Sequence, residues 1–220
     1  HRTGSVPLVL FGIPFHHLTF ASTLDWIDDL VAAGRPSLVA TANLDFLRVA
    51  AEDPEMQRIL FDADIVMADG HPIVALSSLF GPALRERVTG SDLTPMLAER
   101  AAQKGHRLYF LGGAPGVAEK AARILAERHP GLIIAGCYSP AKADVIEMDN
   151  DDLLARLEEA RPDILLVALG APKQEKWIHM QLPRWSIPVA IGIGGSLDFI
   201  AGAQRRAPRW LQRLGLEWLG

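Results

Sequence analysis

Short apolar runs alternate with helical patterns along nearly the whole chain, and this alternation restricts the fold more than any other feature of the sequence. The runs are apolar throughout, which is typical of strands buried on both faces of a parallel sheet. The segments between them carry apolar residues at three- and four-residue spacing, which predicts helices. We therefore expect an α/β protein with a Rossmann-like, mostly parallel sheet and helices on both faces. The expected strands are Leu8–Phe11, Ser37–Thr41, Ile65–Ala68, Arg107–Leu111, Leu132–Gly136, Ile164–Ala168 and Val189–Ile193.

The ends of the expected helices carry residue types that commonly cap helices: short polar side chains at the N-terminus and glycine after the C-terminus. The expected helices include Ser22–Ala33, Ser91–Gln103, Gly116–Arg128 and Asp152–Ala160. The expected N-caps are Ser22, Ser91 and either Asp151 or Asp152. The expected C-terminal glycines are Gly34 and Gly105.

The chain's 220 residues fit one domain spanning residues 1–220, because no linker, repeat or low-complexity tract divides them. We expect His1–Ser5, which lack a starting methionine, to be an added segment. Hydrophobic residues make up 49% and charged residues 22%, a balance that supports a core without disulfide or metal staples. The net charge of −4 argues against a nucleic-acid binder. The single cysteine, Cys137, cannot form an internal disulfide, so we expect a reducing compartment.

Polar residues stand where several expected strands end, and open α/β sheets bind ligands at the carboxyl ends of their strands. Asp69 directly follows the strand Ile65–Ala68, where a carboxylate can act as a general base toward a substrate hydroxyl. Thr41 and Asn43 end the preceding strand, and their short polar side chains suit hydrogen bonds to sugar hydroxyls. Capping of the following helices is the alternative role for all three side chains.

Arg87, Lys173 and Gln174 are candidates for binding a nucleotide. Arg87 precedes an expected helix start, where a guanidinium can hold a phosphate through two hydrogen bonds. Lys173 and Gln174 follow a sharp strand-to-helix turn that contains Pro172, and their side chains suit a diphosphate and a uracil or sugar. The alternatives are a surface salt bridge for Arg87 and a solvated first helical turn for the other two side chains.

Glycine pairs after two strands permit close approach of the backbone to a phosphate. Gly112 and Gly113 open one such loop, and Gly194 and Gly195 lie in the other. The first loop lacks the spacing of the dinucleotide-binding fingerprint, so a tight turn explains it equally well. The acidic stretch 144–152 lacks the glycine and the final glutamate of a calcium loop, and we expect no metal site there.

The C-terminal stretch Arg205–Leu219 combines four arginines with two tryptophans. A basic amphipathic segment of this kind suits an anionic membrane surface. The alternative is a terminal helix packed on the core with solvated arginines. No apolar run of the sequence approaches the ~20 residues that a membrane-spanning helix needs.

A set of motifs follows a fixed order along the chain: Thr41–Asn43, Ala68–Gly70, Arg87–Leu93, Leu111–Gly113, Gly170–Glu175, Gly192–Asp198, and Arg206–Pro208 through Gly215–Trp218. In this order they resemble the motifs of the WecG/TagA/CpsF family of bacterial glycosyltransferases (glycosyltransferase family 26). The resemblance extends from about Gly12 to Trp218. Each motif alone is a modest signal, but their combination is highly specific.

The resemblance implies an inverting, metal-independent transfer of a sugar from a UDP-sugar, without a cofactor, to a polyprenyl-diphosphate-linked saccharide. Products of the family include teichoic acid linkage units, common antigen and exopolysaccharides. By resemblance, Asp69 is the base that deprotonates the acceptor hydroxyl, and Thr41 is a second catalytic residue. The residues expected to bind substrate are Asn43, Arg87, Lys173, Gln174, Gly112, Gly113, Gly194 and Gly195.

The resemblance also implies a cytoplasmic enzyme on the inner face of the bacterial plasma membrane, with a lipid-linked acceptor and the membrane surface as partners. The family continues beyond the Glu217–Leu219 segment with a basic appendage, and we expect this appendage to be absent from a sequence that stops at Gly220. The donor sugar is open among N-acetylmannosamine, its uronic acid and glucose, and a homo-oligomer is one option. Two alternatives remain: a non-catalytic nucleotide-sugar-binding module, and an NAD-dependent oxidoreductase that uses Gly112–Gly116.

Overall fold

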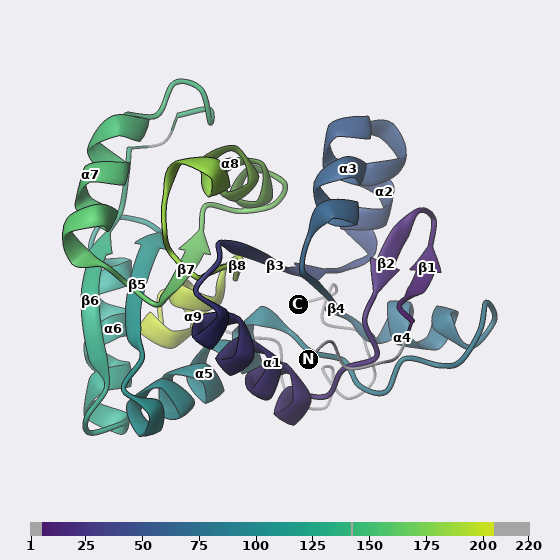
Figure 1. Cartoon of the computed structure of the whole chain (residues 1–220), viewed down its shortest axis with the longest axis horizontal. Helices are drawn as coiled ribbons and strands as arrows, with labels where there is room; N and C mark the ends of the chain where they lie inside the picture. Colours follow the sequence, from purple (N-terminus) through teal and green to yellow (C-terminus); the bar gives the residue numbers. More distant parts are fainter. Residues whose placement is uncertain (1–5, 142, 205–220) are drawn as a thin grey trace.

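The structure is a computed structural model that describes residues 6–141 and 143–204. These residues form a six-stranded parallel sheet with helices on both faces, and a separate two-stranded hairpin (Figure 1). The predicted α/β, Rossmann-like class is therefore confirmed. The strand order is β4-β3-β8-β7-β5-β6, and every neighbouring pair is parallel. The strands of this sheet are β3 (Ser37–Ala42), β4 (Ile65–Ala68), β5 (Arg107–Gly112), β6 (Ile133–Tyr138), β7 (Ile164–Ala168) and β8 (Val189–Gly192).

The predicted strand Leu8–Phe11 does not join the parallel sheet. It ends at Leu10 as β1 (Leu8–Leu10) and pairs antiparallel with β2 (Ile13–Phe15). Phe11 and Gly12 have φ angles of 49° and 83° and form the turn between the two strands. Positive φ at both central residues is what a tight hairpin turn requires, so the chain reverses here and cannot continue into a crossover helix.

Alternate residues of each central strand contribute to two hydrophobic cores, one on each face of the sheet. On β3, Leu38 and Ala40 belong to the first core, whereas Val39 belongs to the second. Helices α2 (Leu44–Glu52), α3 (Pro54–Asp62), α4 (His71–Ser77), α7 (Asn150–Ala160) and α8 (Lys173–Gln181) contribute to the first core, together with the hairpin. Helices α1 (Phe20–Ala33), α5 (Gly90–Lys104), α6 (Val117–Arg128) and α9 (Ser196–Ala201) contribute to the second. A short 3-10 helix, η1 (Leu182–Arg184), follows α8.

The three predicted N-caps are wrong by two or three residues, because a polar residue slightly earlier in the chain takes the cap. Thr19 caps α1, and Ser22 instead completes a capping box, in which its hydroxyl accepts a hydrogen bond from Thr19 N at 2.9 Å. Thr89 caps α5 and Asp149 caps α7, because each side chain accepts a hydrogen bond from the backbone N–H three residues later. The predicted C-terminal glycines are confirmed: Gly34 and Gly105 end α1 and α5 with φ angles of 67° and 76°.

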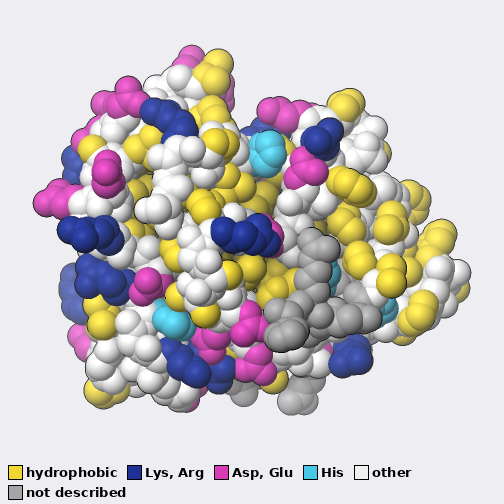
Figure 2. Space-filling view, viewed as in Figure 1, with side chains coloured by type: hydrophobic (Ala, Val, Ile, Leu, Met, Phe, Trp, Pro, Cys, Tyr) yellow, Lys and Arg dark blue, Asp and Glu magenta, His cyan; other side chains and the backbone are white. Residues whose placement is uncertain are grey.

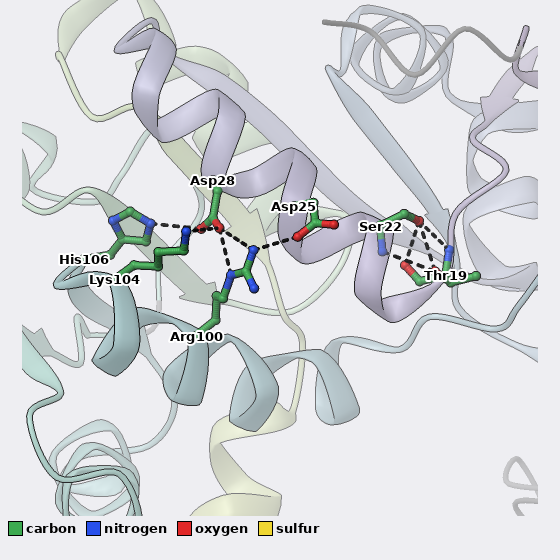
Figure 3. A network of polar contacts seen from close by, with 7 residues as sticks. All are labelled: Thr19, Ser22, Asp25, Asp28, Arg100, Lys104 and His106. Atoms are coloured by element: carbon green, nitrogen blue, oxygen red, sulfur yellow. Dashed lines mark hydrogen bonds and ion pairs between the residues drawn. The ribbon is translucent and has the colours of Figure 1, made fainter.

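A cluster of charged residues joins α1 to the C-terminal end of α5 (Figure 3). Asp28 accepts a hydrogen bond from Arg100 Nε at 2.8 Å, and its other oxygen lies 3.0 Å from His106 Nε2. Arg100 also contacts Asp25 at 2.6 Å. The hydrogen bond to Asp28 is the main reason that the pKa of Arg100 is raised above its usual value. Because this cluster joins two helices on the same face, it helps to fix α5, whose other end begins beside Asp69.

The crossovers of β3 and β8 open a space at the carboxyl ends of these neighbouring strands. The chain leaves β3 for α2 on one face of the sheet, and it leaves β8 for α9 on the other face. Two adjacent strands whose continuations diverge in this way form a crevice, which is where open α/β sheets bind ligands.

The exits of β5 and β7 diverge in the same manner, but a close backbone contact fills the space between them. Gly113 N donates a hydrogen bond to Ala168 O at 3.0 Å. Gly112 has a φ angle of 111°, and a Cβ atom added there would lie 2.3 Å from Ala168 O. Only glycine fits at this position without displacing the backbone of β7.

We expect Gly112→Ala to lower the free energy of unfolding by about 3 kcal/mol or more, because the new methyl group collides with backbone. Gly105→Ala is the matched control, since Gly105 also has positive φ but nothing within 4 Å of its added Cβ. The control should lose only about 1 kcal/mol, from the left-handed backbone alone. Urea denaturation of the two variants measures the difference, and equal losses would contradict the collision.

Candidate active site

A pocket of about 180 Å³ lies at the carboxyl ends of β3, β4 and β8. Its lining residues are Thr41, Asn43, Phe46, Asp69, Ser91, Ala171, Gln174, Ile193, Gly194, Gly195, Ser196 and Phe199. The structure thus brings together six of the predicted site residues, from four segments that are far apart in the sequence. Ligand pockets commonly measure about 300–1,000 Å³, so the described residues enclose only part of a ligand as large as a nucleotide sugar.

A larger cavity, of about 790 Å³, lies at the opposite edge of the sheet. Its lining includes Asp163 and Pro188, which directly precede β7 and β8, and it contains none of the predicted site residues. We place the candidate active site in the smaller pocket, because the carboxyl edge is where open α/β sheets hold their ligands and where the polar side chains converge.

Asp69 follows β4 directly and is half-buried at the edge of the pocket. Its backbone N–H donates to Ala42 O at 2.9 Å, which ties the residue to the end of β3. Its carboxylate accepts a long hydrogen bond, 3.4 Å, from Gly90 N at the start of α5. The N-cap of α4 is Gly70, so Asp69 lies one residue before the cap position.

Thr41 and Asn43 take different roles at the end of β3. Thr41 is buried, and its hydroxyl donates to Gly192 O at 3.0 Å, so it links β3 to the end of β8. Asn43 is exposed and caps α2, because its side-chain oxygen accepts from Asp45 N at 3.0 Å and Phe46 N at 3.3 Å. Both residues still line the pocket, so capping and ligand contact are compatible for Asn43.

Gln174 is only 1% exposed, so the expectation of a solvated first helical turn is wrong for this side chain. Its Oε1 accepts a hydrogen bond from Gly194 N at 3.2 Å, and its Nε2 donates to Glu175 Oε1 at 2.8 Å. Lys173, the preceding residue, extends away from the lining and donates to Ala143 O in the segment after β6. The two neighbours therefore serve different parts of the molecule.

Arg87, Lys173, Gly112 and Gly113 are not among the lining residues. The side chain of Arg87 is 15% exposed, and its guanidinium lies 3.6 Å from the carboxylate of Asp92. This ion pair is therefore more buried than the surface salt bridge that was the alternative role for Arg87. Gly112 and Gly113 form the tight contact between β5 and β7. Their predicted contacts with substrate stay predictions, as does the role of the basic stretch Arg205–Leu219, which lies outside the described residues.

Sequence analysis missed Glu175, which is fully buried in α8. Burial raises the pKa of its carboxyl to about 7. One carboxyl oxygen accepts from Gln174, and the other has no hydrogen-bond partner among the described residues. A signal was available, because Gln174, Trp177, Ile178 and Gln181 share the three- and four-residue spacing of a buried helical face. This spacing places the start of α8 against the sheet.

In the part of the chain that the structure describes, no group of three or more His, Cys, Asp or Glu residues is arranged to hold a metal ion. The same ranges contain no helix with the length and apolar character needed to cross a membrane.

Comparison with known proteins decides the family. The model of the glycosyl transferase WecG/TagA/CpsF family matches residues 8–220. The chain belongs to this family. The predicted family and enzyme class are confirmed, and the protein is a glycosyltransferase. Family membership also removes the basis for the alternative of an NAD-dependent oxidoreductase.

Three relatives of this glycosyltransferase carry one name, N-acetylglucosaminyldiphosphoundecaprenol N-acetyl-beta-D-mannosaminyltransferase. The Bacillus spizizenii protein is 34% identical over 183 residues, which are 83% of this chain and 69% of that protein. The Bacillus subtilis protein is 30% identical, with 95% of this chain and 80% of that protein covered. A Staphylococcus aureus protein is 26% identical, with 99% of this chain and 85% of that protein covered.

The buried carboxyl of Glu175 predicts a pH-dependent stability of this glycosyltransferase. The folded-state pKa, about 7, exceeds the ordinary value of 4.5, so the folded state favours the protonated form. The contribution of the protonated Glu175 carboxyl to the free energy of unfolding is fully present below pH ~4.5, and it is lost as the pH rises through ~7. The free energy of unfolding should therefore fall by about 3 kcal/mol across this window relative to Glu175→Gln. Chemical denaturation of both proteins from pH 4.5 to pH 8 measures the difference, and parallel curves would contradict it.

Proposed function

We propose that this glycosyltransferase moves an N-acetylmannosaminyl group from a UDP-linked donor to the sugar of an N-acetylglucosaminyl-diphospho-polyprenol acceptor. The names of the relatives support the transferred sugar and the lipid-linked acceptor. Among the donor sugars that the sequence leaves open, N-acetylmannosamine is thereby favoured. The reaction contributes to bacterial cell-surface polysaccharide synthesis, proceeds with inversion, and uses neither a metal ion nor a cofactor.

The observation that carries the proposal is the position of Asp69. Its half-buried carboxylate lines a pocket together with Thr41, Gln174 and Gly194, which come from the ends of three neighbouring strands or the helices that follow them. A single displacement needs one base, one aligned hydroxyl and a bound leaving group, and a pocket of this composition can supply them.

In the proposed reaction, Asp69 accepts the proton of the acceptor hydroxyl as that oxygen attacks the anomeric carbon of the donor sugar. The new carbon–oxygen bond forms on the face opposite the diphosphate. The bond between the anomeric carbon and the diphosphate oxygen breaks, and UDP leaves with the electron pair, so the anomeric configuration inverts. Asp69 ends the step protonated and returns its proton to solvent.

Arg87 is our candidate for the positive charge that stabilises the leaving diphosphate. It lies three residues before Gly90, whose backbone N–H contacts Asp69. The segment that presents this guanidinium is therefore the same segment that positions the base. Asn43, Gly194 and Gly195 would contact the sugars through their pocket-lining atoms.

Asp69→Asn should lower the rate of transfer by about 10²–10⁴-fold, because the amide cannot accept the proton. Binding of UDP should change little, since the amide keeps the size of the side chain. The assay follows transfer from UDP-N-acetylmannosamine to a short-chain lipid-linked acceptor, with EDTA present, and calorimetry measures UDP binding.

Asp62→Asn is the control for this experiment, because Asp62 pairs with Arg58 on α3 and does not line the pocket. It should transfer at the wild-type rate. Near-normal transfer by Asp69→Asn would remove Asp69 from the mechanism. A wild-type protein that binds UDP but transfers no sugar would instead favour the non-catalytic binding module.

We also propose that the protein works on the surface of an anionic membrane, and an exposed apolar patch supports this. The patch consists of Val9, Phe11, Leu79 and Phe80, whose exposed fractions are 57%, 62%, 77% and 57%. Figure 2 shows hydrophobic side chains gathered on the side of the molecule where β1, β2 and α4 lie. The rings of Phe11 and Phe80 are in contact, with centroids 6.0 Å apart.

The position of the patch favours a membrane as its partner. Helix α4 runs directly from Asp69 and Gly70 toward Leu79 and Phe80, so the patch is connected to the candidate base by one short helix. Arg85 is exposed in the segment that follows and would face anionic head groups. An acceptor anchored in the bilayer would then present its diphosphate sugar near the pocket.

Replacing Phe11 and Phe80 by serine should reduce binding to vesicles that contain phosphatidylglycerol at least tenfold, because two aromatic side chains no longer enter the interface. Cosedimentation with the vesicles measures the change. Ile146→Ser is the control, since Ile146 is 85% exposed in the loop after β6, away from the patch. Unchanged vesicle binding, or a change only in the oligomeric mass measured by light scattering, would contradict a membrane-binding patch.

A further inference from the structure

The mechanism proposed above leaves the buried carboxyl of Glu175 unused. Glu175 is 0% exposed and is not among the residues that line the pocket. Its only described side-chain partner is Gln174, which does line the pocket. A carboxyl group that is fully buried beside a pocket residue is costly to keep, so its contacts merit a functional explanation.

The side-chain amide of Gln174 is held at both ends by partners that fix its orientation. Gly194 N can only donate, so it must face the amide oxygen, at 3.2 Å. Glu175 Oε1 accepts from the amide nitrogen at 2.8 Å. Exchanging the oxygen and the nitrogen would bring donor against donor at Gly194, and acceptor against acceptor at Glu175 when Oε1 carries no proton. The second N–H of Gln174 is then left in a defined direction.

The backbone of β8 packs against the side chains of Gln174 and Glu175 at Gly192. A Cβ atom added at Gly192 would lie 2.4 Å from Glu175 Oε1 and 2.7 Å from Gln174 Nε2. The peptide of Gly192 therefore packs directly against both side chains. Its carbonyl oxygen also accepts the hydrogen bond of Thr41, at 3.0 Å. Glu175, Gln174 and Thr41 are thus linked through a single strand end.

We propose that Glu175 is a positioning residue, which holds the amide of Gln174 in one orientation so that Gln174 and the Gly194 loop present a fixed set of hydrogen-bonding groups to the donor substrate. Its role is indirect, because Glu175 itself does not reach the pocket. The activity readout of this inference rests on the proposed function, whereas the orientation of Gln174 can be observed without any turnover.

Among the described residues, no opposite charge contributes to the pKa of Glu175. Helix α8 packs against β3, β8, α3 and η1, and neither β3 nor β8 carries an ionisable side chain in its span. Lys176 is paired with Asp53 and Glu55 at the start of α3, at 2.6 and 2.7 Å. Arg184 of η1 is paired with Asp151 at 2.7 Å. Burial accordingly raises the pKa of Glu175, and glutamine resembles the protonated form.

Two substitutions separate positioning from packing. Glu175→Gln keeps an oxygen that can accept from Gln174, whereas Glu175→Met fills a similar volume with no strong acceptor. Glu175→Met removes the cost of burying a carboxyl but leaves one N–H of Gln174 without its acceptor. These two effects oppose each other, so the variant is expected to fold, and thermal denaturation checks this first. We expect Glu175→Met to raise the KM for the UDP-sugar at least tenfold with a smaller effect on kcat. Glu175→Gln should stay within about twofold of wild type at pH 6.

Nuclear magnetic resonance of the Gln174 side-chain amide provides the second measurement. The N–H that bonds to residue 175 should be shifted downfield and protected from solvent exchange in wild type and in Glu175→Gln, and should lose that shift and protection in Glu175→Met. Wild-type KM in Glu175→Met, equal impairment of both variants, or unchanged amide signals in Glu175→Met would each overturn the inference. If the wild type transfers no sugar but its amide signals respond as expected, the proposed function fails and the positioning role stands.

Discussion

The hydrogen bond from Thr41 to Gly192 O lies at the point on which the arrangement of the site depends. It joins the ends of two parallel strands whose continuations then separate to opposite faces of the sheet. The two segments that diverge after β3 and β8 form the sides of the crevice. Side chains on these segments keep a fixed geometry only if the two strand ends are held together. The hydrogen bond of Thr41 holds them together. Gly192, which has no side chain, leaves room for the side chains of α8 to pack against the end of β8.

Much of the fold could be predicted because the strands are buried on both faces, which forces an uninterrupted apolar run in each. The hairpin was missed because the run Leu8–Leu10 looks the same in either kind of sheet, and only the backbone at Phe11 and Gly12 reverses the chain. The helix starts were misplaced because Thr19 and Ser22 are both good caps, and their reciprocal hydrogen bonds, not residue type, decide which one begins the helix.

The candidate site could be predicted from the polar residues at the ends of the expected strands. The order of the strands in the sheet, which decides which strand ends lie together, could not be predicted. Asp69 and Gly194 follow β4 and β8, and Thr41 lies near the end of β3; these three strands are neighbours in the sheet. Gly112 is the last residue of β5, which is separated from β3 by β7 and β8, and local sequence does not reveal that separation. Glu175 escaped notice for another reason: a charged residue in the first turn of a helix is usually solvated, and only packing against β8 buries this one.

The seam between Gly112 and Ala168 has a consequence for how the enzyme handles a large substrate. Backbone contact closes the space between the exits of β5 and β7, and this space cannot widen without separating β5 from β7. Any rearrangement that widens the candidate site for a large substrate therefore has to occur elsewhere, and the pocket itself lies at the ends of β4, β3 and β8.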